Sequence, residues 1–139
     1  MEVRAAKGAS LLRDLGVCED DTIVIIMRND VTCCEIMRAI ALAGAVTVQV
    51  NWHSTQTEVS EILKDCNAKL VISHRDFIKR LGHVLEDVQV LGVMPSKTIK
   101  LSYNITNPLE LNNLHVPEWA NLIEKEAPIL NKFLMRPMM

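Results

Sequence analysis

The chain has 139 residues, the size of one globular domain, and an ordinary composition with 49% hydrophobic and 23% charged residues. Its formal net charge is −2 and like charges form no long run, which argues against nucleic acid or an anionic membrane as a main partner. No apolar stretch reaches the roughly 18 residues that span a bilayer, and the start of the chain lacks the apolar region of a secretion signal, so we expect a cytoplasmic protein.

The first elements are a helix and a buried strand. Residues 3–15 have apolar positions at helical spacing, and Gly16 follows them as the residue that ends the helix. Residues 22–27 are a β-branched run without polar alternation. Such a run is typical of a strand that is buried on both faces of a parallel sheet.

The same alternation continues to about residue 93. Asn29-Asp30 can cap a helix that runs to about Ala43 and ends at Gly44. Thr55 or Thr57 can cap the next helix, and a capping box is available because Ser54 or Thr55 precedes Glu58. The remaining predicted elements are a strand over 46–50, a strand over 70–73, a helix over 76–85 and a strand over 88–93.

Beyond Pro95 the alternation ends. Residues 95–118 contain three prolines and several asparagines, which favours a loop with a short strand over 97–103. A last helix is predicted over 118–126. The tail over 133–139 is apolar, and an apolar terminus is unusual unless something covers it.

Together these patterns predict an α/β fold. Strands that alternate with helices form βαβ units, so we expect one domain with a mostly parallel sheet of about four or five strands and helices on both faces. Within it, residues 1–94 form the βαβ core, and residues 95–139 form a Pro/Asn-rich extension with a short helix and an apolar tail.

The four cysteines, Cys18, Cys33, Cys34 and Cys66, have no Cys-x-x-Cys or Cys-x-x-His spacing. We expect free and mostly buried thiols rather than a metal or redox site. The histidines are also too far apart to indicate a metal site.

Several stretches lie between residues 12 and 77. Their order and spacing indicate a relationship to other proteins more specifically than any single stretch does. They are Leu12–Val17 with the acidic turn after it, Ile23–Asn29, Arg38–Val46, Asn51-Trp52-His53 and Glu61–Ile72. In this order they resemble the N-terminal part of AMP-forming acyl-CoA synthetases, which belong to the adenylate-forming superfamily. Trp119 and Arg136-Pro137-Met138-Met139 look like the approach to that family's phosphate loop.

The resemblance implies a parent reaction in which a carboxylate is adenylated and then converted to a thioester, with ATP, magnesium and coenzyme A. By the resemblance, the family's phosphate loop would begin just after Met139, so we expect this chain to lack that loop and the later motifs that hold adenine, ribose and magnesium. The five glycines are scattered singly and form no phosphate cradle. We therefore expect no catalytic, cofactor-binding or metal-binding residues in this chain.

Two groups of polar and aromatic residues follow predicted strands, at the edge where open α/β sheets bind ligands. Trp52 and His53 are the candidate substrate-binding residues, as an apolar wall and a hydrogen-bonding group for a small molecule or acyl chain. The favoured interpretation is that Trp52 packs against neighbouring loops and His53 positions a turn. His74-Arg75-Asp76, at the end of the next strand, could bind an anion or transfer protons. The favoured interpretation is that Asp76 caps a helix and Arg75 is solvated.

Two hypotheses follow. The chain is a truncated acyl-CoA synthetase-like domain without competent ligase activity, or it is a stand-alone module that binds an acyl or coenzyme A fragment or serves assembly. In either case a surface that the rest of the large domain would cover is open, so we expect a homodimer or another homo-oligomer, formed by residues 95–139 or by an outer strand. The remainder of an acyl-CoA synthetase is a further candidate partner.

Overall fold

The computed structural model describes residues 2–105 and 116–127. Its centre is a parallel sheet of four strands, β1 (Thr22–Ile26), β2 (Val46–Gln49), β3 (Leu70–His74) and β4 (Gln89–Val93). Their order is β2-β1-β3-β4, and all three pairings are parallel. The predicted α/β class and strand number are confirmed.

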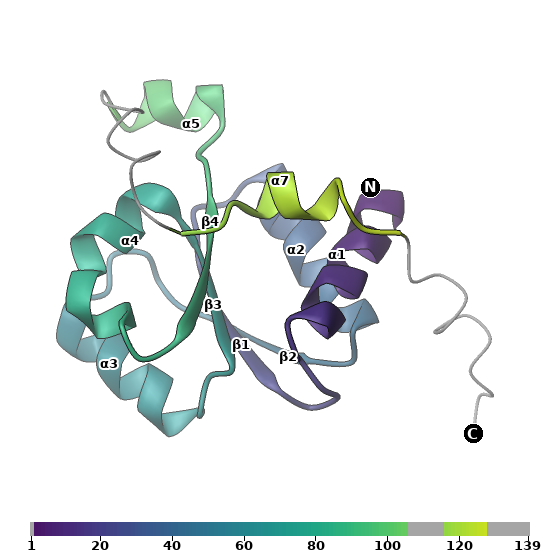
Figure 1. Ribbon diagram of the computed structural model, residues 1–139. Helices are drawn as coiled ribbons and strands as arrows, with labels where there is room; N and C mark the ends of the chain where they lie inside the picture. Colours follow the sequence, from purple (N-terminus) through teal and green to yellow (C-terminus); the bar gives the residue numbers. More distant parts are fainter. Residues whose placement is uncertain (1, 106–115, 128–139) are drawn as a thin grey trace.

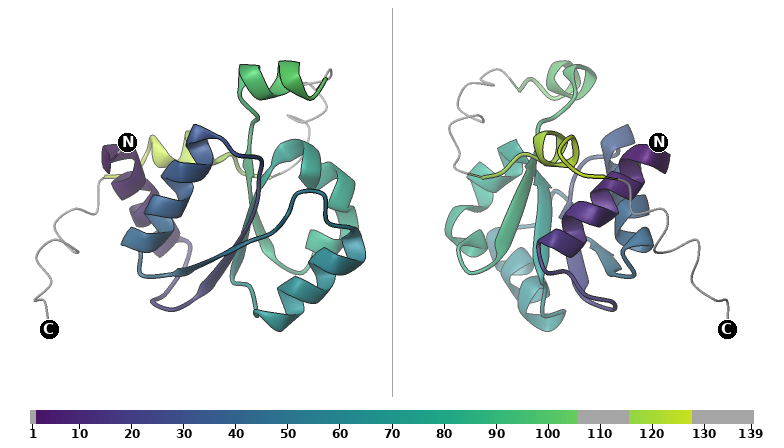
Figure 2. Two further views of the ribbon diagram at one scale, coloured as in Figure 1. Left: turned by 180° about the vertical axis from the view of Figure 1, so that it is seen from behind. Right: turned by 45° about the vertical axis from the view of Figure 1, so that its right-hand side comes forward.

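Helices cover both faces of the sheet (Figure 1). On one face lie α1 (Glu2–Asp14), α2 (Val31–Leu42) and the short α7 (Trp119–Ile123). On the other lie α3 (Gln56–Asp65), α4 (Arg75–Leu81) and the 3₁₀ turn η1 (Gly82–Leu85), as Figure 2 shows from behind.

The central strands are apolar throughout because each face of them meets a helix layer. In β1, Ile23 and Ile25 belong to the core under α1 and α2, whereas Val24 and Ile26 belong to the core under α3 and α4. All four side chains are fully buried. Two cores therefore sit back to back on the sheet, as the unbroken β-branched run predicts.

The helix ends mostly follow their capping signals. Asp30 caps α2 by accepting a hydrogen bond from the Thr32 N–H at 3.4 Å. Thr55, not Thr57, caps α3 and accepts from the Glu58 N–H at 3.2 Å. Gly44, at φ +78°, ends the α2 region in the left-handed conformation that favours glycine.

Three predicted elements need correction. The strand over 97–103 is wrong: this segment is a helix, α5 (Lys97–Ser102), because Ser96 caps it and Ile99 alone supplies a buried side chain. The helix over 76–85 divides into α4 and η1 at Gly82, which adopts φ +51°. The last helix is shorter than predicted, and the tail over 133–139 lies outside the described residues.

Gly8 lets three helices meet on one face. A Cβ atom at this position would lie 2.7 Å from the Trp119 ring and 2.8 Å from the Ala39 Cβ. Only a glycine in α1 allows α2 and α7 to approach this closely.

The four cysteines form no disulfide, as expected, but the expectation that most are buried is wrong. Cys33 is buried, Cys66 is half-buried, and Cys18 and Cys34 are exposed. Burial raises the pKa of the Cys33 thiol, which keeps it protonated and unreactive at neutral pH.

No helix among the described residues is both long enough and apolar enough to cross a lipid bilayer.

Candidate functional site

The carboxyl ends of β1 and β3 meet at the centre of the sheet. The connection that leaves β1 passes over one face to β2, and the connection that leaves β3 passes over the other face to β4. The two chains therefore diverge at this point, and such a switch point is where open α/β sheets bind ligands. We take the side chains at this edge as the candidate functional site.

Arg28 fills the switch point. It follows β1 and is only 6% exposed. Its Nη1 and Nη2 atoms donate to the two carboxylate oxygens of Asp76 at 3.2 Å and 2.7 Å. Asp76 belongs to α4, so the ion pair joins the ends of β1 and β3 in the two-pronged geometry that guanidinium and carboxylate groups share. The prediction that Asp76 caps its helix is wrong.

Three aromatic rings cover the Arg28 guanidinium. Its Cζ lies 4.2 Å from the ring centre of Phe77, 4.6 Å from that of Tyr103 and 5.1 Å from that of Trp52. Trp52 stacks on Phe77 and meets Tyr103 edge-on, with ring centres 5.6 Å and 5.5 Å apart. The rings come from the segments after β2, β3 and β4, and each stabilises the cation through its π face.

His74, at the end of β3, is completely buried behind Arg28. Its Nδ1 accepts a hydrogen bond from the Arg28 backbone N–H at 3.1 Å, so its proton sits on Nε2. Nε2 faces Asp30 Oδ2 at 3.6 Å, and neither atom has a hydrogen-bond partner among the described residues. Because Nε2 carries the proton, this imidazole is not available as a metal ligand. We call Arg28, Trp52, His74, Asp76, Phe77 and Tyr103 the switch-point cluster.

The His74 environment predicts a loss of stability in mild acid. Burial, and then the Arg28 charge, lower the pKa of His74 below its ordinary value near 6.5, against the opposite influence of Asp76 and Asp30. Below that value the unfolded chain binds a proton that the folded chain does not, so the free energy of unfolding falls with pH by at most about 1.4 kcal/mol per unit. Above a pH of about 6.5, the contribution of neutral His74 to the free energy of unfolding is fully present.

Urea unfolding between roughly pH 8 and pH 5 measures this dependence. The matched variant is His74→Asn, whose side-chain oxygen can accept from the Arg28 N–H but does not titrate. We expect a shallower pH dependence in the variant than in the parent chain. Equal slopes in the two proteins would show that His74 is not the source.

Arg75 holds residues 116–118 beside the sheet. It is 3% exposed, and its Nη1 donates to the Val116 carbonyl at 3.0 Å and to Glu118 at 3.2 Å. The second Glu118 oxygen accepts from the Met94 N–H at 2.9 Å. Burial raises the pKa of Glu118 despite these contacts. The prediction that Arg75 is solvated is therefore wrong: it fixes residues 116–118 beside β4.

Trp52 and His53 lie at the predicted edge, but they differ in environment. Trp52 is half-buried and engaged with Phe77 and Tyr103. His53 is exposed, and its backbone N–H donates to the Asn51 side chain at 2.9 Å. The structure thus brings Trp52 into the switch-point cluster and leaves His53 at its rim. His115, the most C-terminal of the four histidines, lies outside the described residues.

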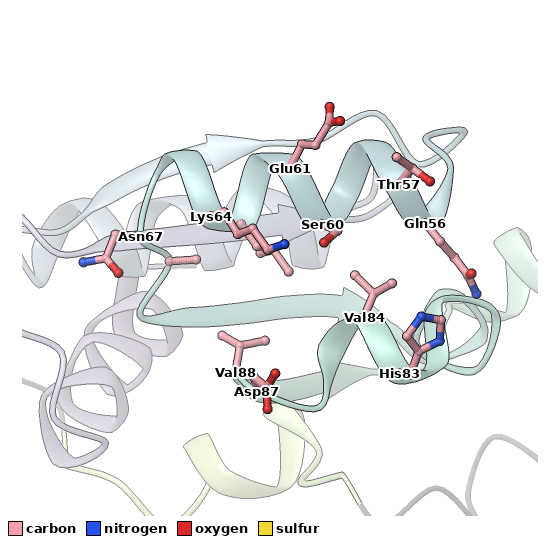
Figure 3. A pocket seen from close by; sticks show the side chains of 12 residues that line it. Gln56, Thr57, Ser60, Glu61, Lys64, Asn67, His83, Val84, Asp87 and Val88 are labelled. Atoms are coloured by element: carbon pink, nitrogen blue, oxygen red, sulfur yellow. The ribbon is translucent and has the colours of Figure 1, made fainter.

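A separate groove of about 710 Å³ runs between α3 and η1, away from the switch point (Figure 3). Its half-buried floor includes Leu63 and Val84, and its exposed walls carry Glu61, Lys64 and His83. The walls are of mixed charge, and none of the described polar residues that line the groove is buried. Among the described residues, no three His, Cys, Asp or Glu side chains come together in a way that could hold a metal ion.

Sequence reasoning missed Arg28, Phe77 and Tyr103. The signal for Arg28 was present, because a charged residue directly after a buried strand lies at the carboxyl edge of the sheet. No comparable signal exists for Tyr103, which lies in the segment for which a strand was predicted.

The sequence model of the family described as "AMP-binding enzyme" matches residues 1–129. The chain is 36% identical over 72 residues to a long-chain-fatty-acid–CoA ligase of Mycobacterium tuberculosis, which covers 52% of this chain and 14% of that ligase. It is 29% identical over 110 residues to 4-coumarate–CoA ligase 3 of Arabidopsis thaliana, which covers 73% and 19% of the two chains. The chain thus spans less than a fifth of these relatives.

Solved structures show the same fold. A benzoate CoA ligase from Burkholderia xenovorans superposes with a TM-score of 0.71 at 25% identity, over 91% of this chain and 22% of that one. An anthranilate CoA ligase in complex with anthranoyl-AMP gives a TM-score of 0.70 at 17% identity, over 89% and 22%. The resemblance that the sequence stretches indicate is confirmed.

Proposed function

The chain belongs to the AMP-binding enzyme family, and from this premise we propose that it is an acyl-CoA ligase-like domain that has no ATP-dependent ligase activity by itself and that self-associates. The observation that carries the first part is the filled switch point. Arg28, Asp76 and three rings occupy the crevice in which an open α/β sheet would hold a nucleotide.

The groups at this edge do not fit ATP and magnesium. The Asp76 carboxylate is satisfied by Arg28, and the Arg28 guanidinium is enclosed by rings rather than directed outward. A triphosphate also needs several backbone N–H donors and a lysine, and the singly placed glycines of the sequence form no such cradle. We therefore assign no catalytic, cofactor-binding or metal-binding residue to this chain.

A pyrophosphate-release assay tests the lack of activity. The chain is incubated with ATP, magnesium, coenzyme A and one of acetate, benzoate or palmitate, and an active acyl-CoA ligase serves as the positive control. We expect release at the level of the protein-free blank. Release that depends on both the chain and the carboxylic acid would overturn the proposal.

Self-association is supported by an exposed apolar side chain in the edge strand of the sheet. Val46 in β2 is 47% exposed, and no described residue pairs with the outer side of this strand. An apolar group on an unpaired strand edge favours pairing with another chain. Sedimentation velocity over about 5–200 µM should show a concentration-dependent dimer, because weak dimers form in the micromolar range. A further stretch of acyl-CoA ligase polypeptide is the alternative partner for this surface.

The second candidate function is binding of an acyl or coenzyme A fragment at Trp52 and His53. The observation in its favour is that His53 is exposed beside the aromatic rings at the carboxyl edge. It is the weaker candidate because the Trp52 ring already packs on Phe77 and Tyr103. Calorimetry with coenzyme A and with short and long fatty acids tests it, and no heat of binding from any of them would remove it.

A further inference from the structure

The two edges of the sheet are not equivalent. At the β4 edge, the Gly92 N–H donates to the Pro117 carbonyl at 2.8 Å, and Glu118 forms a parallel bridge with Gly92. The segment that Arg75 holds thus pairs with the carboxyl-terminal part of β4 (Figure 1). At the opposite edge, β2 pairs with β1 on one side, and no described residue pairs with its other side.

The backbone N–H and C=O groups of successive residues in β2 point alternately toward β1 and away from it, so only every second residue bonds to β1. The Val46 N–H donates to Asp21 and the Val50 N–H donates to Ile25, so the even-numbered residues direct their backbone groups toward β1. By the two-residue period of a strand, the N–H and C=O groups of Thr47 and Gln49 point away from the sheet.

Natural edge strands are protected by lysine, proline, a bulge or a covering segment. None of these features is found at the β2 edge among residues 2–105 and 116–127. The sequence of β2 is Val-Thr-Val-Gln, without charge or proline, and its register with β1 is continuous from Val46 to Gln49. The strand is therefore suited to receive another strand.

We propose that β2 pairs antiparallel with β2 of a second copy of this chain, with the twofold axis at Val48. In this register Thr47 lies opposite Gln49 of the second copy, and the two exchange both of their N–H···O=C bonds. Gln49 of the first copy and Thr47 of the second copy exchange the equivalent two bonds, which gives one continuous sheet through the dimer. The inference rests on the self-association proposed above and adds its location, direction and register.

Charges at the two ends of β2 favour the antiparallel direction. Asp20 is exposed at the amino end, where its N–H donates to the Gly44 carbonyl at 2.9 Å. Arg80 is exposed at the carboxyl end, where its Nη2 donates to the Trp52 carbonyl at 2.6 Å. Antiparallel strands place the acidic end of one copy beside the basic end of the other, whereas parallel strands would place like charges together.

Thr47→Pro tests the edge. Its N–H points away from β1, so proline removes an outward donor and no hydrogen bond of the sheet, a position that edge strands tolerate. Because the change removes a donor from each copy, we expect the dissociation constant of the dimer to rise at least about tenfold, with the melting temperature of the monomer preserved. Thr47→Val keeps the N–H and should dimerise like the parent chain.

Cross-linking tests the register. In a background with Cys18→Ser and Cys34→Ser, Val48→Cys places two thiols directly opposite each other across the twofold axis, where a disulfide can form. Val46→Cys is the matched control, because Val46 lies opposite Val50 of the second copy and far from its own equivalent. We expect rapid disulfide dimers from Val48→Cys and few from Val46→Cys.

The outcomes separate this inference from the proposal on which it rests. A parent chain that stays monomeric throughout the concentration range would overturn both. A dimer that survives Thr47→Pro, or cross-links equally through both cysteines, would overturn the β2 pairing and leave self-association intact. If Thr47→Pro does not fold, hydrogen exchange of the parent chain decides: the Thr47 and Gln49 amides should gain protection as the protein concentration rises, and constant exchange would refute the pairing.

Discussion

Replacing Arg28 by methionine is expected to lower the free energy of unfolding by about 3–4 kcal/mol, the lower part of the range for a broken buried ion pair. The substitution keeps an apolar chain of similar length among Trp52, Phe77 and Tyr103. It leaves the Asp76 carboxylate without its partner, and that carboxylate is 80% removed from solvent, with a side-chain exposure of 20%. Urea unfolding at neutral pH measures the change.

A double-mutant cycle separates the ion pair from the packing of the rings. Asp76→Asn alone leaves Arg28 as an unpaired buried cation and should also be destabilising. The double variant should lose less than the sum of the single losses, because neither charge is then left alone, and couplings of about 0.5–3 kcal/mol are usual for residues in contact. Additive losses would show that Arg28 stabilises the edge through its contacts with the rings and not through Asp76.

Trp119→Ala is expected to cost about 3–5 kcal/mol, the usual range for removal of a fully buried large aromatic side chain. Trp119 is completely buried against Gly8, and its Nε1 donates to the buried Glu35 carboxylate at 3.2 Å. The change therefore leaves both a cavity and a less well satisfied carboxylate under α1. The measurement is the midpoint and the slope of urea unfolding.

Two further variants make this prediction specific. Trp119→Phe keeps most of the ring and removes the Nε1 donor, so it should cost less than the alanine variant. Trp52→Ala removes the same residue type from a half-buried position and should also cost less. If Trp119→Ala unfolds as readily as the parent chain, the segment over 116–127 does not contribute to the core as the structure describes.

The candidate site could be located from sequence but not assembled. The edge was predictable because Trp52 follows the second strand and His74 ends the third, and carboxyl ends of parallel strands share one edge. The contacts could not be predicted, because Arg28 and Asp76 are 48 residues apart in the sequence. By sequence alone, Arg28 was consistent with a solvated position and Asp76 with a helix cap. Nothing local distinguishes a charged residue that pairs in the core from one that faces water.

The predictions for the short elements were wrong for a related reason. A stretch of six or seven residues such as 97–103 contains too few turns for a helical period to differ clearly from a strand pattern, so one buried contact and one cap decide it. Ser96 and Ile99 made this segment a helix, and Tyr103 at its end then reached Arg28.

The amino-acid sequence by itself determined the α/β class, the parallel strands and the family resemblance. The signals for these features, which are unbroken β-branched runs, capping residues and glycines that end helices, act over a few neighbouring residues. Only the tertiary structure decided the strand order, which sheet edge pairs with a further described segment, and that Arg28 meets Asp76 at the switch point. These depend on packing between segments tens of residues apart, and the free energy of such contacts has no local signature in the chain.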